Sequence, residues 1–447
     1  MTKSPSSNSG RPNRSVQNSA QNRHPTQSFA QPQPPAHAPI TPARSAAFAA
    51  LVRAADTSAH SDDLLHGPGM SALSQADRNL ATTLVLGVLR WQIALDARMQ
   101  PLLQRPDQAL PTPVATALRM GAFQLLHLDR IPAHAALSES VELVRAAGHP
   151  HAAGMVNAIL RTLTRQPPAK PKLYETTAAF AERLAHPLWL ADRWVQNYGR
   201  TAALAILTHD QQEPDDASLF TPNPDLPHLD DGSRLVAELA AASHATPIRI
   251  WDTCAAPGGK TLILAARHPG AQLLATDANL RRLQALTTRL QATSPQTKTL
   301  HADATALPET ESLFDLILCD VPCSGTGTLS RNPEIRQRLQ PADLARQATR
   351  QREILTAALT RLAPGGHLLY STCSLEPEEN EQVVAAALAA TPGITTLPLD
   401  PILTNLATTG LLPAGAPADL LRTGNLRTLP GANFRGDGFF AALLHRP

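Results

Sequence analysis

The chain has 447 residues, 43% of them hydrophobic, which is enough apolar material to bury the cores of about three domains. Thirty-nine Lys and Arg residues face 37 Asp and Glu residues, so the formal charge is +2, and a nucleic-acid partner must be held by local basic patches. Four cysteines exclude a disulfide-rich secreted fold. Because no apolar run approaches the roughly 18 residues of a membrane span and no signal peptide is visible, we expect a soluble, cytoplasmic protein without a membrane partner.

Residues 1–41 are rich in Ser, Asn, Gln and Pro and contain four basic residues but no carboxylate. Such a segment cannot bury enough apolar area to offset the entropy lost on ordering, so it is predicted to be a disordered tail. A solvated linker, an RNA-attracting segment and an organelle transit peptide all fit this composition, although the amphipathic periodicity of a transit peptide is absent.

Residues 42–165 show the periodicity of helices. Apolar residues recur three and four positions apart, as at Leu80, Leu84 and Val88, in short stretches bounded by Pro, Gly or Asp. A succession of such helices predicts an all-α bundle. Residues 166–172 then hold three prolines and two lysines, which is the composition of an interdomain linker.

Residues 173–242 continue as a helical connecting region, and from residue 243 onward apolar runs alternate with helical segments. The expected strands are Ile248–Thr253, Leu273–Thr276, Phe314–Cys319 and His367–Thr372, with a last run, Phe439–Leu444, as an antiparallel edge or inserted strand. Helices between the first four strands imply crossover connections and a mostly parallel sheet. Residues 243–447 are therefore predicted to form a Rossmann-like α/β domain.

A glycine-rich turn follows the first of these strands and opens a helix at Thr261. The turn consists of Cys254, Ala255, Ala256, Pro257, Gly258, Gly259 and Lys260. Glycines let a ligand approach the backbone closely, and the helix start offers unpaired N–H groups. A phosphate-binding loop would need a glycine in place of Cys254, and the G-x-G-x-x-G fingerprint of nicotinamide cofactors is missing. The remaining candidate ligand is S-adenosylmethionine.

Three carboxylates are placed to complete this cofactor site. Asp277 ends the next strand, 19 positions after Gly258, near the roughly 20-residue offset at which a carboxylate meets ribose hydroxyls. Asp303 would end a third strand, where it can accept from an adenine amino group, and Asp320 ends the fourth. Capping of a helix or turn is the common alternative for such residues. Lys260 is either a cofactor contact or a solvated residue of the first helical turn.

Two cysteines follow strands in motif-like loops, Cys323 in Asp320–Gly327 and Cys373 in Ser371–Asn380. Both lie just beyond the carboxyl end of a strand, on the edge where such sheets bind ligands, so two thiols are expected to face one pocket. Cys319, inside an apolar run, is predicted to be a buried hydrophobe. The spacing of the cysteines matches no zinc-ligand pattern, so no metal is expected.

These motifs resemble those of the Sun-type RNA cytosine-5 methyltransferases. The resemblance rests on Asp252–Lys260, Asp320–Gly327, Ser371–Asn380 and Asp437–Phe440. The helical domain resembles the NusB module that is fused to ribosomal members of that family, on the stretches Asp77–Leu80, Gly87–Trp91 and Val156–Arg161. The resemblance implies an all-α, NusB-like RNA-binding domain at 42–165, followed at 243–447 by a class I S-adenosylmethionine-dependent methyltransferase domain.

For the site, the resemblance implies that a cytosine of 16S ribosomal RNA is methylated through a covalent adduct at carbon 6. Cys373 would be the nucleophile, Cys323 would assist proton removal or product release, and Asp320 would hydrogen-bond or protonate the ring nitrogen. The cytosine must be single-stranded, bulged or flipped, because a stacked base cannot present carbon 6. Arg331 is the basic residue that we single out for RNA contact, and we expect a monomer.

One departure from the family and two alternative functions remain open on the sequence. The RNA-recognition segment of the family is shortened here to residues 211–230, which bears on substrate binding more than on chemistry. An amino-group methyltransferase would use an Asp-Pro-Pro-Tyr-like loop, which Asp320–Cys323 resembles only weakly. An RNA-binding assembly factor would keep the fold and bind the cofactor without methylating RNA.

Overall fold

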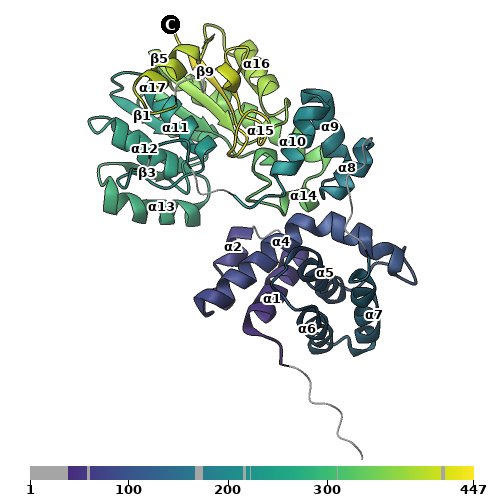
Figure 1. Ribbon diagram of the computed structural model, residues 1–447. Helices are drawn as coiled ribbons and strands as arrows, with labels where there is room; N and C mark the ends of the chain where they lie inside the picture. Colours follow the sequence, from purple (N-terminus) through teal and green to yellow (C-terminus); the bar gives the residue numbers. More distant parts are fainter. Residues whose placement is uncertain are drawn as a thin grey trace, which may run out of the picture. The chain divides into compact units, whose positions relative to one another are not determined.

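The computed structural model describes residues 39–57, 61–166, 175–214, 218–221, 223–309, 311–413 and 418–447. The predicted tail lies outside these ranges except for residues 39–41, and the predicted linker lies outside them except for residue 166. A helical part comes first along the chain and an α/β part second, in the order in which the sequence predicted them (Figure 1).

The first part is an all-α bundle. Its elements are α1 (Pro42–Asp56), α2 (Ser61–Leu65), α3 (Pro68–Ser71), α4 (Gln75–Met99), η1 (Gln100–Leu102), α5 (Thr112–His127), α6 (Ala133–Ala146), η2 (Pro150–Ala152) and α7 (Ala153–Leu163). Leu84 and Val88 of α4 are buried in its core. The ring of Phe123 on α5 lies where a Cβ at Gly87 would stand, so glycine at this position lets α5 pack closely on α4. The predicted bundle is confirmed.

Among the described residues, one helical stretch, α4 with η1, is long and apolar enough to cross a membrane by length and composition alone. Leu84, Val85 and Leu95 on this stretch are at most 1% exposed because they pack in the bundle core, and the core helix of a soluble protein passes the same test. Arg78 and Arg90 interrupt the apolar run, which is why the sequence showed no continuous span of that length.

Three helices connect the bundle to the α/β part, namely α8 (Thr177–Arg183), α9 (Leu188–Tyr198) and α10 (Arg200–His209). Phe180, Trp194 and Ile206, one from each helix, are fully buried in a single cluster. The same cluster contains Leu329 and Leu375, which follow the two loop cysteines in sequence. The connecting helices therefore support the loops that carry the cysteines. The described residues between α10 and residue 231 form no helix or strand.

Among the described residues, the α/β part has a nine-stranded mixed sheet. Its strands are β1 (Arg249–Asp252), β2 (Gln272–Asp277), β3 (Lys298–His301), β4 (Phe314–Asp320), β5 (Leu362–Thr372), β6 (Thr395–Leu397), β7 (Leu421–Arg422), β8 (Asn425–Arg427) and β9 (Phe440–His445). The order is β3-β2-β1-β4-β5-β9-β8-β7, and β6 also pairs with β9. Strands β1 to β5 are parallel, whereas β9 is antiparallel and inserted beside β5. The last predicted strand is thus an inserted strand rather than an edge.

Helices cover both faces of this sheet (Figure 1). One face packs against α11 (Asp231–Ser243), α12 (Gly259–Arg267), α13 (Leu280–Thr293) and α17 (Asp400–Thr408), and the other against α15 (Pro341–Thr360) and α16 (Glu381–Ala390). The shorter elements η3 (Ala304–Ala306), η4 (Thr326–Thr328), α14 (Ile335–Arg338) and η5 (Ala418–Leu420) lie in connections. Ile250 and Trp251 on β1 point to opposite clusters. With both faces buried, the edge formed by the carboxyl ends of the parallel strands is the expected ligand site of such a sheet.

Candidate active site

The turn after β1 has a backbone conformation that glycine accommodates best. Gly258, the residue before α12, has a φ of 100°, and a Cβ there would clash with Leu286 on α13. Ala255 N donates to Thr276 O at 2.8 Å, which anchors the turn to β2. The turn brings the chain to the start of α12, where the first N–H groups have no partner within the helix. This site fits the polar end of a nucleoside-type cofactor.

Asp277 and Asp303 both have local partners. Asp277 accepts from Ala256 N at 3.2 Å and from Asn279 N at 2.7 Å, which ties the end of β2 to the cofactor turn. Asp303, two residues beyond β3, caps η3 and is ion-paired with Arg350 of α15. The capping alternative is therefore realised for Asp303. Because a carboxylate has lone pairs to spare, ribose and adenine contacts by these two residues stay predictions.

Asp252 lies at the base of this site, although the sequence analysis did not single it out. It ends β1, is 1% exposed, and accepts from Thr261 Oγ1 at 2.7 Å. Burial, followed by the nearby carboxylates of Asp320 and Asp277, raises the pKa of Asp252 to about 7. In the sequence, the position of Asp252 at the start of the Asp-Thr-Cys motif indicated only that a strand ends there.

We expect the Asp252→Asn variant to flatten the pH dependence of stability. The ordinary pKa of this carboxyl is 3.8, whereas in the folded protein it is about 7. Between these values the folded state binds a proton that the unfolded state has lost, so the Asp252 contribution to the free energy of unfolding falls by up to about 4 kcal/mol as pH rises. Urea unfolding at pH 4 to 8 measures this. Parallel pH profiles for the variant and the wild type would contradict the expectation.

Lys260 and Asp320 form an ion pair that joins the first turn of α12 to the end of β4. Lys260 Nζ lies 2.8 Å from Asp320 Oδ2, and Ser371 Oγ donates to Asp320 Oδ1 at 2.7 Å. Burial by itself would lower the pKa of Lys260, but the attraction of Asp320 outweighs it, so the pKa is raised and the amine stays charged. Neither alternative that the sequence left for Lys260 anticipated this pair.

The two loop cysteines lie side by side beyond the ends of β4 and β5. Cys323 Sγ and Cys373 Sγ are 3.3 Å apart, and both side chains are partly exposed. The hydrogen bond with Cys373, together with burial, raises the pKa of Cys323 well above its ordinary value, so Cys323 keeps its proton. The charge of Lys260 is close enough to interact with Cys373. Cys373 is therefore the thiol of the pair that lies near a positively charged amine.

The other two cysteines are not poised for chemistry. Cys319 is fully buried on β4, as predicted. Burial raises the pKa of Cys254 to about 12, so this residue remains a thiol that lines the cofactor turn. Within the part of the chain that the structure describes, no group of three or more His, Cys, Asp or Glu side chains could hold a metal ion.

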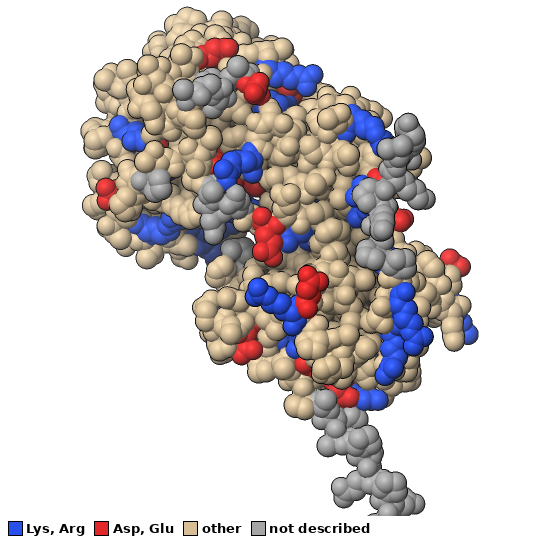
Figure 2. Space-filling view, in the orientation of Figure 1, with Lys and Arg blue, Asp and Glu red and all other residues tan. Residues whose placement is uncertain are grey.

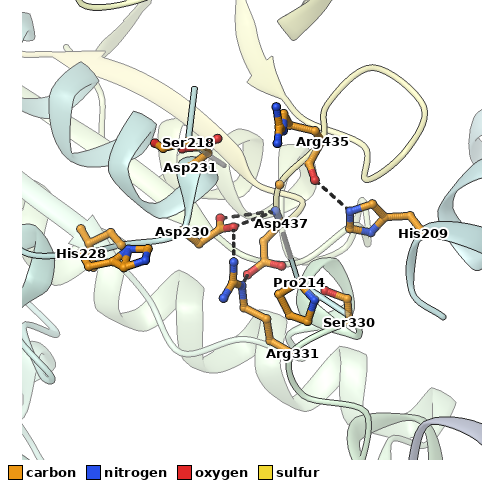
Figure 3. A pocket seen from close by; sticks show the side chains of 12 residues that line it. His209, Pro214, Ser218, His228, Asp230, Asp231, Ser330, Arg331, Arg435 and Asp437 are labelled. Atoms are coloured by element: carbon orange, nitrogen blue, oxygen red, sulfur yellow. Dashed lines mark hydrogen bonds and ion pairs between the residues drawn. The ribbon is translucent and has the colours of Figure 1, made fainter. Parts of the chain in front are cut away.

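Arg331 lines a small pocket that is formed by the connecting region, the loop after β4 and the segment before β9, and there it bridges two carboxylates (Figure 3). Its guanidinium is 3.1 Å from Asp230 Oδ2 and 3.2 Å from Asp437 Oδ2. Burial and the charge of Asp230 raise the pKa of Asp437 well above its ordinary value. RNA contact by Arg331 stays a prediction, and a phosphate there would compete with these carboxylates for the guanidinium.

These features together define the class of the protein. A Rossmann-like sheet with β9 inserted antiparallel beside β5, a glycine turn after β1 and a carboxylate at the end of β2 is the arrangement of class I S-adenosylmethionine-dependent methyltransferases. The residues of the turn, with Gly258 at the start of α12, fit that cofactor.

Comparison with known proteins identifies the family. A family model described as 16S rRNA methyltransferase RsmB/F matches residues 239–445, and a NusB family model matches residues 41–165. Ribosomal RNA small subunit methyltransferase B of Klebsiella pneumoniae subsp. pneumoniae is 33% identical over 421 residues, which cover 84% of this chain and 92% of that protein. The chain belongs to the RsmB family of 16S rRNA methyltransferases and is an S-adenosylmethionine-dependent rRNA methyltransferase.

One further relative agrees with this assignment, and one solved structure shares the fold. Probable ribosomal RNA small subunit methyltransferase B of Bacillus subtilis is 29% identical over 456 residues, covering 91% of this chain and 99% of that protein. The crystal structure of PH0851 matches with a TM-score of 0.67 and 20% identity, covering 92% of this chain and 100% of that chain, and shows the same fold.

Proposed function

We propose that this enzyme methylates carbon 5 of a cytosine in 16S rRNA through a covalent bond between Cys373 and carbon 6 of the base. The proposal rests on the two thiols, 3.3 Å apart, at the sheet edge where Lys260 and Asp320 also lie. Methylation of an amino group needs no thiol, so a pair of adjacent cysteines at this edge favours methylation of carbon.

The chemistry requires a nucleophile because carbon 5 of cytosine is unreactive while the ring stays aromatic. Addition of the Cys373 thiolate to carbon 6 breaks the 5,6 double bond and moves electron density to carbon 5. Residues 254–260 with Asp277 and Asp303 would hold S-adenosylmethionine, whose sulfonium would give its methyl group to carbon 5 and leave as a neutral thioether. A base then removes the proton from carbon 5, and the departure of Cys373 restores the double bond.

Cys323 and Asp320 assist different steps of this reaction. Cys323 Sγ lies 3.3 Å from Cys373 Sγ, so Cys323 is close enough to assist proton removal or product release after the methyl transfer. Asp320 is placed to hydrogen-bond or protonate the ring nitrogen, which makes carbon 6 more electrophilic. Lys260 pairs with Asp320 and keeps a positive charge beside the nucleophile.

We also propose how the RNA is bound. The target cytosine is single-stranded, bulged or flipped, the NusB-like domain at 42–165 and Arg331 contact the RNA, and the enzyme acts as a cytoplasmic monomer. In the same proposal, residues 173–242 form the connecting region and residues 243–447 form the catalytic domain. On the face drawn in Figure 2, Lys and Arg occur in small groups mixed with Asp and Glu. Because the formal charge of the whole chain is only +2, selection depends on the shape of the RNA and on the base pocket more than on a strong electrostatic field.

The proposal is tested by identifying the methylated nucleoside. The purified enzyme is incubated with 16S rRNA and methyl-labelled S-adenosylmethionine, and the RNA is digested and separated by chromatography. We expect the label in 5-methylcytidine. Label in an N-methylated nucleoside would support an amino-group methyltransferase, and cofactor binding without any labelled RNA would support an assembly factor. Bisulfite mapping of RNA from cells with and without the gene then locates the cytosine.

A further inference from the structure

A carboxylate that the sequence analysis passed over connects the two cysteine loops. Glu379 follows β5 and is 0% exposed. It accepts four hydrogen bonds, from Ser324 N at 2.9 Å, from Gln351 Nε2 at 2.8 Å, and from the hydroxyls of Ser324 and Ser374. These donors match the roughly four lone-pair sites of an ionised carboxyl group, so the side chain is fully satisfied in this place.

The residues that Glu379 binds are the immediate neighbours of the two thiols. Ser324 follows Cys323 on the loop after β4, and Ser374 follows Cys373 on the loop after β5. Both hydroxyls donate to the same oxygen of Glu379. One carboxylate oxygen is therefore hydrogen-bonded to two loops that are 50 residues apart in sequence. The loops also contact each other directly, since the two serine hydroxyls are 3.1 Å apart and Gly327 N donates to Cys373 O at 2.9 Å.

Glu379 is itself held from two sides, so it can act as a rigid anchor. Gln351 of α15 donates both to Glu379 and to Pro322 O, the latter at 3.0 Å. Tyr370 on β5 donates its hydroxyl to Glu379 O at 2.6 Å. The anchor thus links a helix on one face of the sheet, a central strand and both cysteine loops.

We propose that Glu379 is the positioning residue that sets the distance and orientation of the Cys323 and Cys373 thiols. It acts through hydrogen bonds to Ser324 and Ser374, not through its charge or a proton. Its consequence for catalysis rests on the function proposed above, whereas its effect on the geometry of the thiols does not.

Two variants of Glu379 separate a hydrogen-bonding role from a role of the charge. Glu379→Ala removes the acceptor that both loops share and leaves their direct contacts, and we expect kcat to fall by about 10²-fold because the reacting groups lose alignment. In Glu379→Gln the amide oxygen can accept from Ser324 N and Gln351 while the amide NH₂ donates to the two hydroxyls. We expect this variant to keep kcat and the KM for cofactor within about threefold of wild type.

A second measurement reports on the thiols without any substrate. Diamide accepts the two thiol hydrogens and leaves a Cys323–Cys373 disulfide, whose rate of formation is followed by mass spectrometry of the alkylated peptides. We expect this rate to fall about tenfold in Glu379→Ala and to recover in Glu379→Gln, because the reaction depends on the approach of the two sulfur atoms.

The matched control is Glu376→Ala, on the same loop. Glu376 is equally buried, but it accepts from Arg193 and Trp194 of α9 and not from the cysteine loops. We expect it to lower stability and leave the disulfide rate unchanged. If Glu379→Ala does not fold, the double variant Ser324→Ala/Ser374→Ala removes the two hydroxyl connections and keeps the hydrogen bond from Ser324 N. It is also expected to slow the disulfide rate.

The outcomes discriminate between the two proposals. If Glu379→Gln is as inactive as Glu379→Ala, Glu379 acts through its charge or a proton and the inference is overturned. The inference is also overturned if the disulfide forms in Glu379→Ala at the wild-type rate. If the wild-type enzyme forms no 5-methylcytidine but the disulfide rates follow the expected order, the proposed function fails and the positioning role of Glu379 stands.

Discussion

Replacing Cys373 with alanine is expected to abolish methyl transfer, and replacing Cys323 with alanine is expected to leave RNA covalently bound to the protein. Without Cys373 nothing adds to carbon 6, so kcat should fall by more than about 10³-fold, as for the loss of other enzymic nucleophiles. Without Cys323 the adduct still forms, but its breakdown loses an assisting group that lies 3.3 Å from the nucleophile.

Two assays measure these effects on the same preparations. Transfer of label from methyl-labelled S-adenosylmethionine gives kcat, and denaturing gel electrophoresis with labelled RNA gives the fraction of protein in the adduct. Cys319→Ala is the matched control, because it removes a sulfur four residues from Cys323 that is fully buried and faces no substrate. If Cys373→Ala is active, or if an adduct forms without Cys373 and requires Cys323, then Cys323 is the nucleophile and Cys373 is the assisting residue.

Replacing Asp320 with asparagine is expected to lower kcat by about 10² to 10³-fold, within the range found for groups that hydrogen-bond or transfer protons in a transition state. The amide cannot protonate the ring nitrogen, and it weakens the ion pair with Lys260, whose Nζ lies 2.8 Å away. The charge beside Cys373 then loses the partner that orients it. Both changes slow the first bond-forming step, the attack on carbon 6.

That step can be isolated by mixing the enzyme with an excess of RNA that carries 5-fluorocytidine, because fluorine at carbon 5 blocks the elimination and traps the adduct. Asp320→Asn should trap it more slowly even when S-adenosylmethionine is saturating, and equilibrium dialysis of the variant gives the Kd that sets this concentration. Asp315→Asn is the control, since Asp315 begins β4 at the opposite edge and accepts from Ile248 N and Arg249 N. Adduct formation at the wild-type rate in Asp320→Asn would remove Asp320 from the mechanism.

Much of the site followed from the sequence because it depends on local backbone geometry. The parallel strands, the glycine turn at Gly258 and the placement of Cys323 and Cys373 just beyond strand ends each follow from short stretches of chain. Parallel strands bring their carboxyl ends to one edge whatever the lengths of the crossovers, so these motifs had to meet. The short strands β6, β7 and β8 were not predicted, since two or three residues show too little periodicity.

By itself, the sequence determined the order of the elements, the family motifs and the residue types at the sheet edge. Only the tertiary structure decided which of these side chains are partners. Lys260 pairs with Asp320, Arg331 with Asp230 and Asp437, and Glu379 with two serines. The burial that raises the pKa of Asp252 likewise could not be predicted from the residues next to it in the sequence. The physical reason is that hydrogen bonds, ion pairs and desolvation depend on distances of a few ångströms between residues far apart in the chain, and packing alone sets those distances.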